Sequence, residues 1–168
     1  MAGDRRRPSS APLLLGGAAS FALRDSDEAD LPTLVDLWVT AWSATGFAID
    51  FEARRPWIDE RLRAHRAAGG AIVVGLDRAG GPTGFVSLDA ANNYLDQLCV
   101  APRERGSGLA SALLDAAKGR SRGLVDLDVN EANGRARRFY EREGFQAVGR
   151  GVSDQSGLPT LRMRWTAL

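Results

Sequence analysis

The stretch V-A-P-R-E-R-G-S-G-L-A, residues 100–110, decides how this chain folds. It lies between an apolar run that ends at Val100 and an apolar helical pattern that begins at Leu109. A glycine-rich loop between a strand and a helix can direct several backbone N–H groups at one anion, because glycine lets the backbone approach closely and the helix N-terminus carries a positive dipole. The stretch therefore predicts a diphosphate-binding loop.

Three common uses of such a loop are excluded by its residues. A Walker-type loop ends in Gly-Lys-Ser/Thr, whereas this one reads Gly108-Leu109-Ala110. A dinucleotide-binding fingerprint requires glycine or alanine where this chain has Ser111. A hydrolase nucleophile elbow requires a glycine on each side of its serine, two positions away, and Ser107 lacks both.

The overall composition predicts one soluble globular domain. Of the 168 residues, 44% are apolar and 26% are charged. The 22 lysines and arginines nearly balance the 21 aspartates and glutamates, which argues against nucleic acid or an anionic membrane as a partner. The single cysteine, Cys99, excludes an internal disulfide and fits the cytosol, and one histidine with one cysteine gives no support for a metal site.

The N-terminal segment is expected to stand apart from the domain. Arg5–Arg7 followed by the apolar stretch Ala11–Ala19 imitates a signal peptide, but two glycines interrupt that stretch. No other stretch approaches the roughly 20 apolar residues of a membrane span. We therefore expect residues 1–20 to be a disordered tail or a segment added for expression, followed by one cytoplasmic domain over residues 21–168.

The hydrophobic periodicity predicts an α/β domain with a mixed sheet of six or seven strands and about four helices. Helices are expected over residues 31–42, from about residue 50 or 56 to 68, 109–118 and 133–143. Strands are expected near residue 21 and over residues 71–76, 83–89, 94–100, 124–129, 145–152 and 160–165.

Two segments of the chain carry distinct sequence motifs, one in the glycine-rich loop and one further along the chain. The first places Arg105, Gly108 and Ala110 after a strand that ends Val-x-Pro. The second reads Leu127-x-Val129-x-x-x-Asn133-x-x-Ala136-x-x-Phe139-Tyr140-Glu141-x-x-Gly144-Phe145. The first resembles the acetyl-CoA signature of the GNAT (GCN5-related) N-acetyltransferases, Gln/Arg-x-x-Gly-x-Gly/Ala, and the second resembles that family's second motif. The order of elements matches the family over nearly the whole domain.

The resemblance implies how acetyl-CoA would bind. The two central strands would splay apart, and the pantetheine arm would lie between them like an extra strand. The backbone N–H of Val100 would face the thioester carbonyl and stabilise the oxyanion of a tetrahedral intermediate. The residues implied in cofactor binding are Leu98, Cys99, Val100, Arg105, Gly106, Ser107, Gly108, Leu109, Ala110, Asn133, Ala136 and Tyr140.

Tyr140 is the candidate general acid. It lies seven residues after Asn133, so both side chains project to one side of a helix. The resemblance implies that its phenol protonates the departing thiolate, while the alternative is a core tyrosine packed with Phe139. Asn133 would hydrogen-bond near the pantetheine or cap the helix.

The general base has three candidates. Asp128 lies where ribosomal-protein acetyltransferases of this family carry an acidic base. Asp96, on the neighbouring predicted strand, has the parity of Val100, and Asp126 has the parity of Asp128. Each carboxylate could act through a water molecule or could instead be held in an ion pair.

Other reactive residues receive structural interpretations. Cys99 is expected to pack beside the cofactor rather than act as a nucleophile. His65 is expected to be structural or on the surface. A run of arginines is expected to form a solvated helix face, with one of them or Arg103 near the 3′-phosphate of CoA: Arg135, Arg137, Arg138 and Arg142.

The acceptor is expected to be a primary amine, and its identity stays open among small molecules, amino acids, aminoglycosides and peptide N-termini. Its cleft would be built from residues 44–51 and 153–160. A non-catalytic CoA-binding module on the same fold is the alternative function. The sequence also leaves open whether the chain forms a homodimer, with Trp165 as a candidate interface residue.

Overall fold

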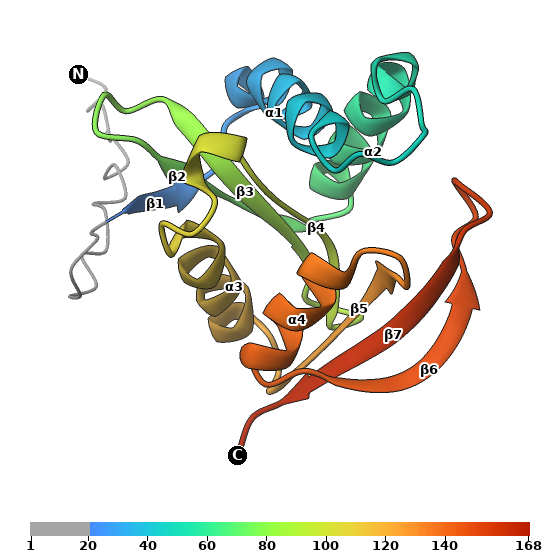
Figure 1. The fold of residues 1–168 in the computed structure, drawn as a ribbon. Coiled ribbons are helices and arrows are strands. Elements are labelled where there is room, and N and C mark those ends of the chain that lie inside the picture. Colours follow the sequence, from blue (N-terminus) through green and yellow to red (C-terminus); the bar gives the residue numbers. More distant parts are fainter. Residues whose placement is uncertain (1–20) are drawn as a thin grey trace, which may run out of the picture.

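The computed structural model describes residues 21–168, so the tail expected over residues 1–20 lies outside the described residues. The chain forms one seven-stranded sheet with four α-helices, which confirms the predicted α/β architecture (Figure 1). The strands are β1 Ala22–Asp25, β2 Ala71–Leu76, β3 Pro82–Asp89, β4 Tyr94–Val100, β5 Leu124–Asn130, β6 Gln146–Val152 and β7 Pro159–Thr166. The helices are α1 Leu31–Ser43, α2 Arg55–Ala67, α3 Leu109–Arg120 and α4 Gly134–Arg142.

The sheet is divided by its one parallel pair of strands. The strand order is β1-β2-β3-β4-β5-β7-β6, and every neighbouring pair except β4 and β5 is antiparallel. Within the described chain, β4 and β5 are in register only at Tyr94 and Asp126. The two strands therefore part toward their C-terminal ends, which confirms the expected splay.

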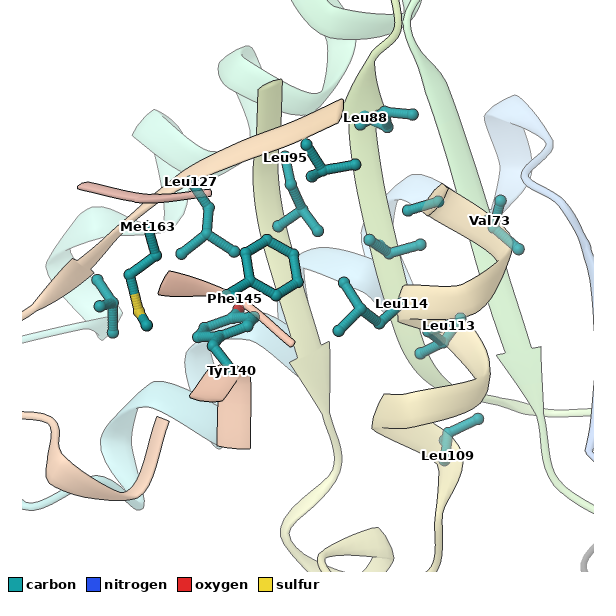
Figure 2. Close-up of a cluster of buried hydrophobic side chains, with 14 of the residues drawn as sticks. Val73, Leu88, Leu95, Leu109, Leu113, Leu114, Leu127, Tyr140, Phe145 and Met163 are labelled. Atoms are coloured by element: carbon teal, nitrogen blue, oxygen red, sulfur yellow. The ribbon is translucent and has the colours of Figure 1, made fainter. Parts of the chain in front are cut away.

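Helices cover both faces of the sheet, so the central strands bury apolar side chains on both faces. In β2, Ile72 and Val74 pack with α1 and α2, whereas Val73 packs on the opposite face with α3. Figure 1 shows α1 and α2 on one side of the sheet and α3 and α4 on the other. Figure 2 shows the second core, in which Leu113 of α3 and Phe145 lie among the strand side chains. Among helices within residues 21–168, none is long and apolar enough to cross a membrane.

Two glycines allow α3 to dock directly on the sheet. A Cβ at Gly84 would lie 2.9 Å from Leu109 Cδ2 and 3.1 Å from the carbonyl oxygen of Cys99. A Cβ at Gly75 would lie 2.6 Å from Leu109 Cδ1. Because Leu109 is the first residue of α3, this close approach fixes where the preceding glycine loop lies.

A bulge in β4 changes which way Asp96 points. Ser87 pairs with Gln97 and Leu88 pairs with Leu95, so Asp96 has no partner in β3. Asp96 and Gln97 therefore both face the α1–α2 side, whereas Val100 packs against the core on the α3 side. The expectation that Asp96 shares a side with Val100 is wrong, because the bulge breaks the alternation.

Candidate functional site

Two cavities meet where β4 and β5 part. The loop cavity, about 450 Å³, is bordered by the glycine loop and α4. The tryptophan cavity, about 470 Å³, is bordered by α1, α2, β5 and the β6–β7 turn. Both volumes are typical of small-molecule sites, which run to about 300–1,000 Å³. Five residues line both cavities: Trp42, Leu98, Asn133, Ala136 and Tyr140.

The glycine loop offers free hydrogen-bond donors to the loop cavity. Gly106 and Gly108 adopt left-handed backbone angles, with φ of 81° and 92°. Gly108 is also the N-cap of α3, so the first N–H groups of that helix have no partner in the preceding turn. Four residues of the loop and of the first turn of α3 line the cavity and have backbone N–H groups without an acceptor among residues 21–168: Gly106, Gly108, Ala110 and Ser111.

Positive charge gathers in the same cavity. Arg105, Arg135 and Arg142 line it, and no carboxylate of the described chain forms an ion pair with any of them. Burial, and secondly the charge of Arg105, lower the pKa of Arg135. The acidic residue of the lining is Glu104, which lies 3.8 Å from Arg103. Free N–H groups and uncompensated guanidiniums together suit a polyanion such as a diphosphate.

The arginine helix face is only partly solvated. Arg135 and Arg142 of α4 reach the loop cavity, as one of the sequence interpretations allowed. Arg137 instead donates to the carbonyl of Glu131 at 3.3 Å. Arg103 lies 3.4 Å from Asp77 and is absent from the lining of the loop cavity.

The backbone N–H of Val100 faces the gap between the splayed strands. Residues of an antiparallel pair exchange hydrogen bonds at alternate positions. The N–H of Ala101 donates to the carbonyl of Thr83 at 2.8 Å, so the N–H of Val100 is directed to the other edge of β4. β5 has already diverged at that edge, and Val100 lines the loop cavity. This N–H is therefore available to an acceptor in the cavity.

Tyr140 lies at the junction of the cavities and is also a core residue. Its ring packs edge-on against Phe139 and Phe145, with centroids 5.2 and 5.5 Å away. Within the described residues its hydroxyl has no hydrogen-bond partner. Burial, and secondly the neighbouring Tyr94, raise the pKa of Tyr140, so the phenol keeps its proton.

Asn133 lies next to Tyr140 in the lining of both cavities. Its Oδ1 accepts a hydrogen bond from the backbone N–H of Ala136 at 3.1 Å. This confirms the N-cap interpretation, since the bond satisfies an N–H in the first turn of α4. The cap also fixes the start of α4 and thereby the position of Tyr140 two turns later.

An aromatic cluster forms one wall of the tryptophan cavity. Trp38 lies 6.0 Å from Trp42, 5.7 Å from Phe51 and 5.7 Å from Trp57, between ring centroids. The indole N–H of Trp38 donates to Gln97 Oε1 at 2.9 Å, which ties the wall to the bulge of β4. Segments 44–51 and 153–160 both contribute lining residues, as expected for the acceptor cleft.

The candidate bases are all held in ion pairs. Arg162 donates to both carboxylate oxygens of Asp128 at 2.8 Å, from the directly opposite position on β7. The hydroxyl of Tyr94 also donates to Asp128, at 3.0 Å. Arg61 of α2 forms a two-pronged pair with Asp96. Asp96 and Asp128 line the tryptophan cavity.

Asp126, the third candidate, lies outside both cavity linings. Arg164 donates to both of its carboxylate oxygens at 2.7 Å, and this bonding lowers the pKa of Asp126. Asp126 is therefore a structural partner of β7, and the bases left for consideration are the two carboxylates of the tryptophan cavity.

Cys99 and His65 have the structural surroundings expected of them. Burial raises the pKa of the Cys99 thiol to about 12, and its Sγ lies 3.7 Å from the carbonyl of Leu37. A buried, protonated thiol is a poor nucleophile. The Nε2 of His65 lies 3.1 Å from the carbonyl of Ala71, and His65 is absent from the lining of both cavities.

Several residues of the tryptophan cavity were missed from the sequence. They are Arg54, Trp57, Arg61, Gln97 and Arg162. The alternation of the last strand does place Arg162 on the polar face, but the strand register that sets it opposite Asp128 has no sequence signal.

A sequence profile of the family described as "Acetyltransferase (GNAT) domain" matches residues 51–167. The chain therefore belongs to the GNAT acetyltransferase family. No curated protein matches the chain by sequence.

Solved structures share the fold at low sequence identity. YjaB from Escherichia coli, solved in its apo form, has a TM-score of 0.71 and 23% identity, covering 88% of this chain and 99% of its own. A phosphinothricin acetyltransferase from Sinorhizobium meliloti, in complex with acetyl-CoA, has a TM-score of 0.70 and 20% identity, covering 88% of each chain. The PaiA N-acetyltransferase from Thermoplasma acidophilum, in complex with coenzyme A, has a TM-score of 0.70 and 20% identity, covering 88% of this chain and 99% of its own.

Proposed function

We propose that this protein transfers an acetyl group from acetyl-CoA directly to a primary amine in a ternary complex. The observation that carries the proposal is the meeting of an anion-binding cavity and an aromatic cavity at Tyr140. Donor and acceptor can enter from opposite sides and meet there, as direct transfer requires. Family membership supports an acetyltransferase, and two proteins of the same fold were solved with acetyl-CoA or coenzyme A.

The residues of the loop cavity fit the cofactor. The N–H groups of Gly106, Gly108 and Ala110 would bind its pyrophosphate, aided by the dipole of α3. Arg135 and Arg142 would bind the remaining phosphate charge. Leu98, Cys99, Val100, Ala136 and Asn133 line the path from this loop to Tyr140 and would contact the pantetheine arm.

Acetyl transfer needs few chemical groups beyond those that line the two cavities. When bound, acetyl-CoA supplies a thioester whose carbonyl carbon bonds to the amine nitrogen as the carbon–sulfur bond breaks. The N–H of Val100 would stabilise the negative charge that develops on the carbonyl oxygen, an effect worth about 2.7–4 kcal/mol in other enzymes. Tyr140 would donate its proton to the departing sulfur, which leaves readily because a thiol has a pKa of only roughly 8.5.

The attacking amine must also lose a proton. Because the oxygens of both Asp96 and Asp128 already accept hydrogen bonds from arginine, we assign proton removal to a water molecule that one of these carboxylates orients. Asp128 is the better placed, since its side chain is 27% exposed and that of Asp96 is 10% exposed. The amine proton would pass through this water to bulk solvent, while the carboxylate orients the water and stabilises the positive charge in transit.

The release of free thiol from acetyl-CoA, measured against a panel of primary amines, tests this function. We expect thiol release that depends on an amine, with one acetylated amine found by mass spectrometry for each thiol. Tight CoA binding without acetylation of any amine would instead identify a non-catalytic CoA-binding module. The cytoplasmic location and the homodimer stay predictions from the sequence.

A further inference from the structure

Three arginines and three aspartates line the tryptophan cavity, and four of these six residues form ion pairs with one another. Arg61 is neutralised by Asp96, and Arg162 is neutralised by Asp128. The other charged residues of the lining are Arg54 and Asp154. Asp154 is exposed on the β6–β7 turn, where water screens its charge. Arg54 is partly buried beside the aromatic wall, and no carboxylate among residues 21–168 forms an ion pair with it.

The guanidinium of Arg54 is held in place by one hydrogen bond, and its other N–H donors have no acceptor in the described part of the chain. It follows Phe51 by one short helical turn, Glu52–Arg54, which leads directly into α2. Its Nη1 donates to the backbone carbonyl of Gln155 at 3.0 Å, so it bridges from this turn to the β6–β7 turn. A guanidinium carries five N–H donors, and this one bond leaves a fork that can bind a carboxylate through two hydrogen bonds.

We propose that the acceptor amine is an amino acid with a large apolar side chain, whose carboxylate binds Arg54. This inference rests on the proposed acetyl transfer and names its acceptor class. The indole and phenyl rings of Trp38, Trp42, Phe51 and Trp57 supply an apolar surface for the side chain. Arg54 supplies the uncompensated positive charge, and the amino group extends toward Tyr140 at the junction.

Other acceptor classes match the cavity less well. A polyamine or an aminoglycoside needs several free carboxylates, whereas Asp96 and Asp128 are paired with Arg61 and Arg162 and leave only the exposed Asp154 unpaired among the described lining residues. A peptide N-terminus carries no carboxylate on its first residue, so it would leave Arg54 without a partner. A free amino acid satisfies both the charge and the aromatic wall.

Calorimetry on the CoA-saturated protein tests the proposal without relying on turnover. L-phenylalanine, L-methionine and L-leucine are each titrated alongside the corresponding primary amide, which lacks the carboxylate charge. We expect at least one acid to bind about 10- to 100-fold more tightly than its amide, the range of a hydrogen bond to a charged group. Equal binding of every acid and amide, or no binding of any acid, would overturn the proposal.

Variants then assign the effect to Arg54. Arg54→Gln should remove the preference for the acid over the amide while leaving amide binding and CoA binding unchanged, and Arg54→Lys should restore part of it. Arg55→Gln is the matched control, because Arg55 is paired with Glu52 and Asp36 and is absent from the cavity lining. An acid preference that survives Arg54→Gln, or that Arg55→Gln also abolishes, would contradict the assignment.

The same pairs, used as substrates, separate this inference from the proposed function. Wild-type protein should acetylate the acid with a higher kcat/KM than the amide, and Arg54→Gln should lower that ratio through KM rather than kcat. If acids bind through Arg54 but no amine is acetylated, the proposed transfer fails while the carboxylate site stands. If amides are acetylated as well as acids, the transfer stands and the acceptor class fails.

Discussion

Tyr94 and Asp126 are the single pair of residues at which β4 and β5 are in register in the described chain. Beyond this pair the parallel strands separate, and the N–H of Val100 is left facing the gap. The two cavities meet beside the same gap, at Leu98 of β4 and Tyr140 of α4. The separation of the two strands thus leaves the N–H of Val100 free and opens the junction of the two cavities.

Replacement of Tyr140 by phenylalanine tests the general acid. The ring should keep its packing against Phe139 and Phe145, because the hydroxyl has no protein partner in the part of the chain described. We expect kcat to fall about 100-fold, at the low end of general-acid effects, with CoA affinity unchanged. Steady-state thiol release and calorimetry measure the two quantities. An unchanged kcat in a folded variant would show that Tyr140 is only a core residue.

The pH dependence follows from the burial of Tyr140. An acid is active while protonated, and burial raises the pKa of this phenol above its ordinary value of about 10. Activity should therefore rise with pH as the acceptor amine loses its proton, with no fall caused by Tyr140 below about pH 10. A kcat–pH profile checks this. A descending limb near neutral pH that disappears in Tyr140→Phe would contradict it.

A glutamate at Gly108 should abolish CoA binding. Gly108 is the left-handed N-cap of α3, and the new carboxylate would oppose the pyrophosphate. Gly80→Glu is the matched control, since Gly80 has φ of 84° and open space around it in the β2–β3 turn. Both variants should lose roughly 1–2 kcal/mol of stability through backbone strain, but only Gly108→Glu should lose CoA binding in calorimetry. Equal CoA affinity in the two folded variants would remove the loop from the cofactor site.

Alanine at Gly84 tests how α3 is anchored. Its Cβ would lie 2.9 Å from Leu109 Cδ2, 3.0 Å from Leu113 Cδ1 and 3.1 Å from a backbone oxygen that cannot easily move. We expect a loss of about 1–3 kcal/mol in the free energy of unfolding and weaker CoA binding, because the loop shifts with α3. Denaturant unfolding measures the first effect. Gly81→Ala, with its nearest contact at 3.4 Å, should change neither quantity.

The thiol of Cys99 should react neither with alkylating agents nor with acetyl-CoA in the folded protein. Since this thiol is buried and its pKa is raised to about 12, alkylation by iodoacetamide in the folded protein should be far slower than in the unfolded chain. Incubation with acetyl-CoA in the absence of an amine should leave no acetyl group on the protein by intact mass. An acetylated Cys99 would replace direct transfer with a two-step mechanism.

Much of the fold could be predicted from the sequence because its signals are local. The alternation of Leu161, Met163 and Arg162 identified β7, and Gly144 marked the end of α4. The bulge at Asp96 could not be predicted, since a bulge depends on how two strands pair rather than on the residues of one. The divergence of β4 and β5 is expected from the family resemblance and not from the hydrophobic pattern of the strands.

The candidate site, too, could be predicted where its residues form a continuous motif and not where they meet only through packing. The loop and the segment from Asn133 to Tyr140 are continuous motifs, so the sequence predicted most of the lining of the loop cavity. Ser107 and Leu109, also predicted to bind the cofactor, do not line it, because Leu109 is buried against the sheet and Ser107 Oγ accepts a hydrogen bond from the Leu109 N–H. Arg54 and Arg61 reach the tryptophan cavity only through the packing of α2 and of the short turn before it, to which no short motif corresponds. The lining of the loop cavity could therefore largely be predicted from the sequence, whereas that of the tryptophan cavity could be predicted only in part.

A crystal structure with CoA bound tests the central claim most directly, namely that donor and acceptor meet at Tyr140. We predict the pyrophosphate against the N–H groups of Gly106, Gly108 and Ala110. The thiol should lie within hydrogen-bond reach of the Tyr140 hydroxyl, with the tryptophan cavity left open for the amine. CoA bound within the tryptophan cavity, or a thiol that ends away from Tyr140, would contradict the account.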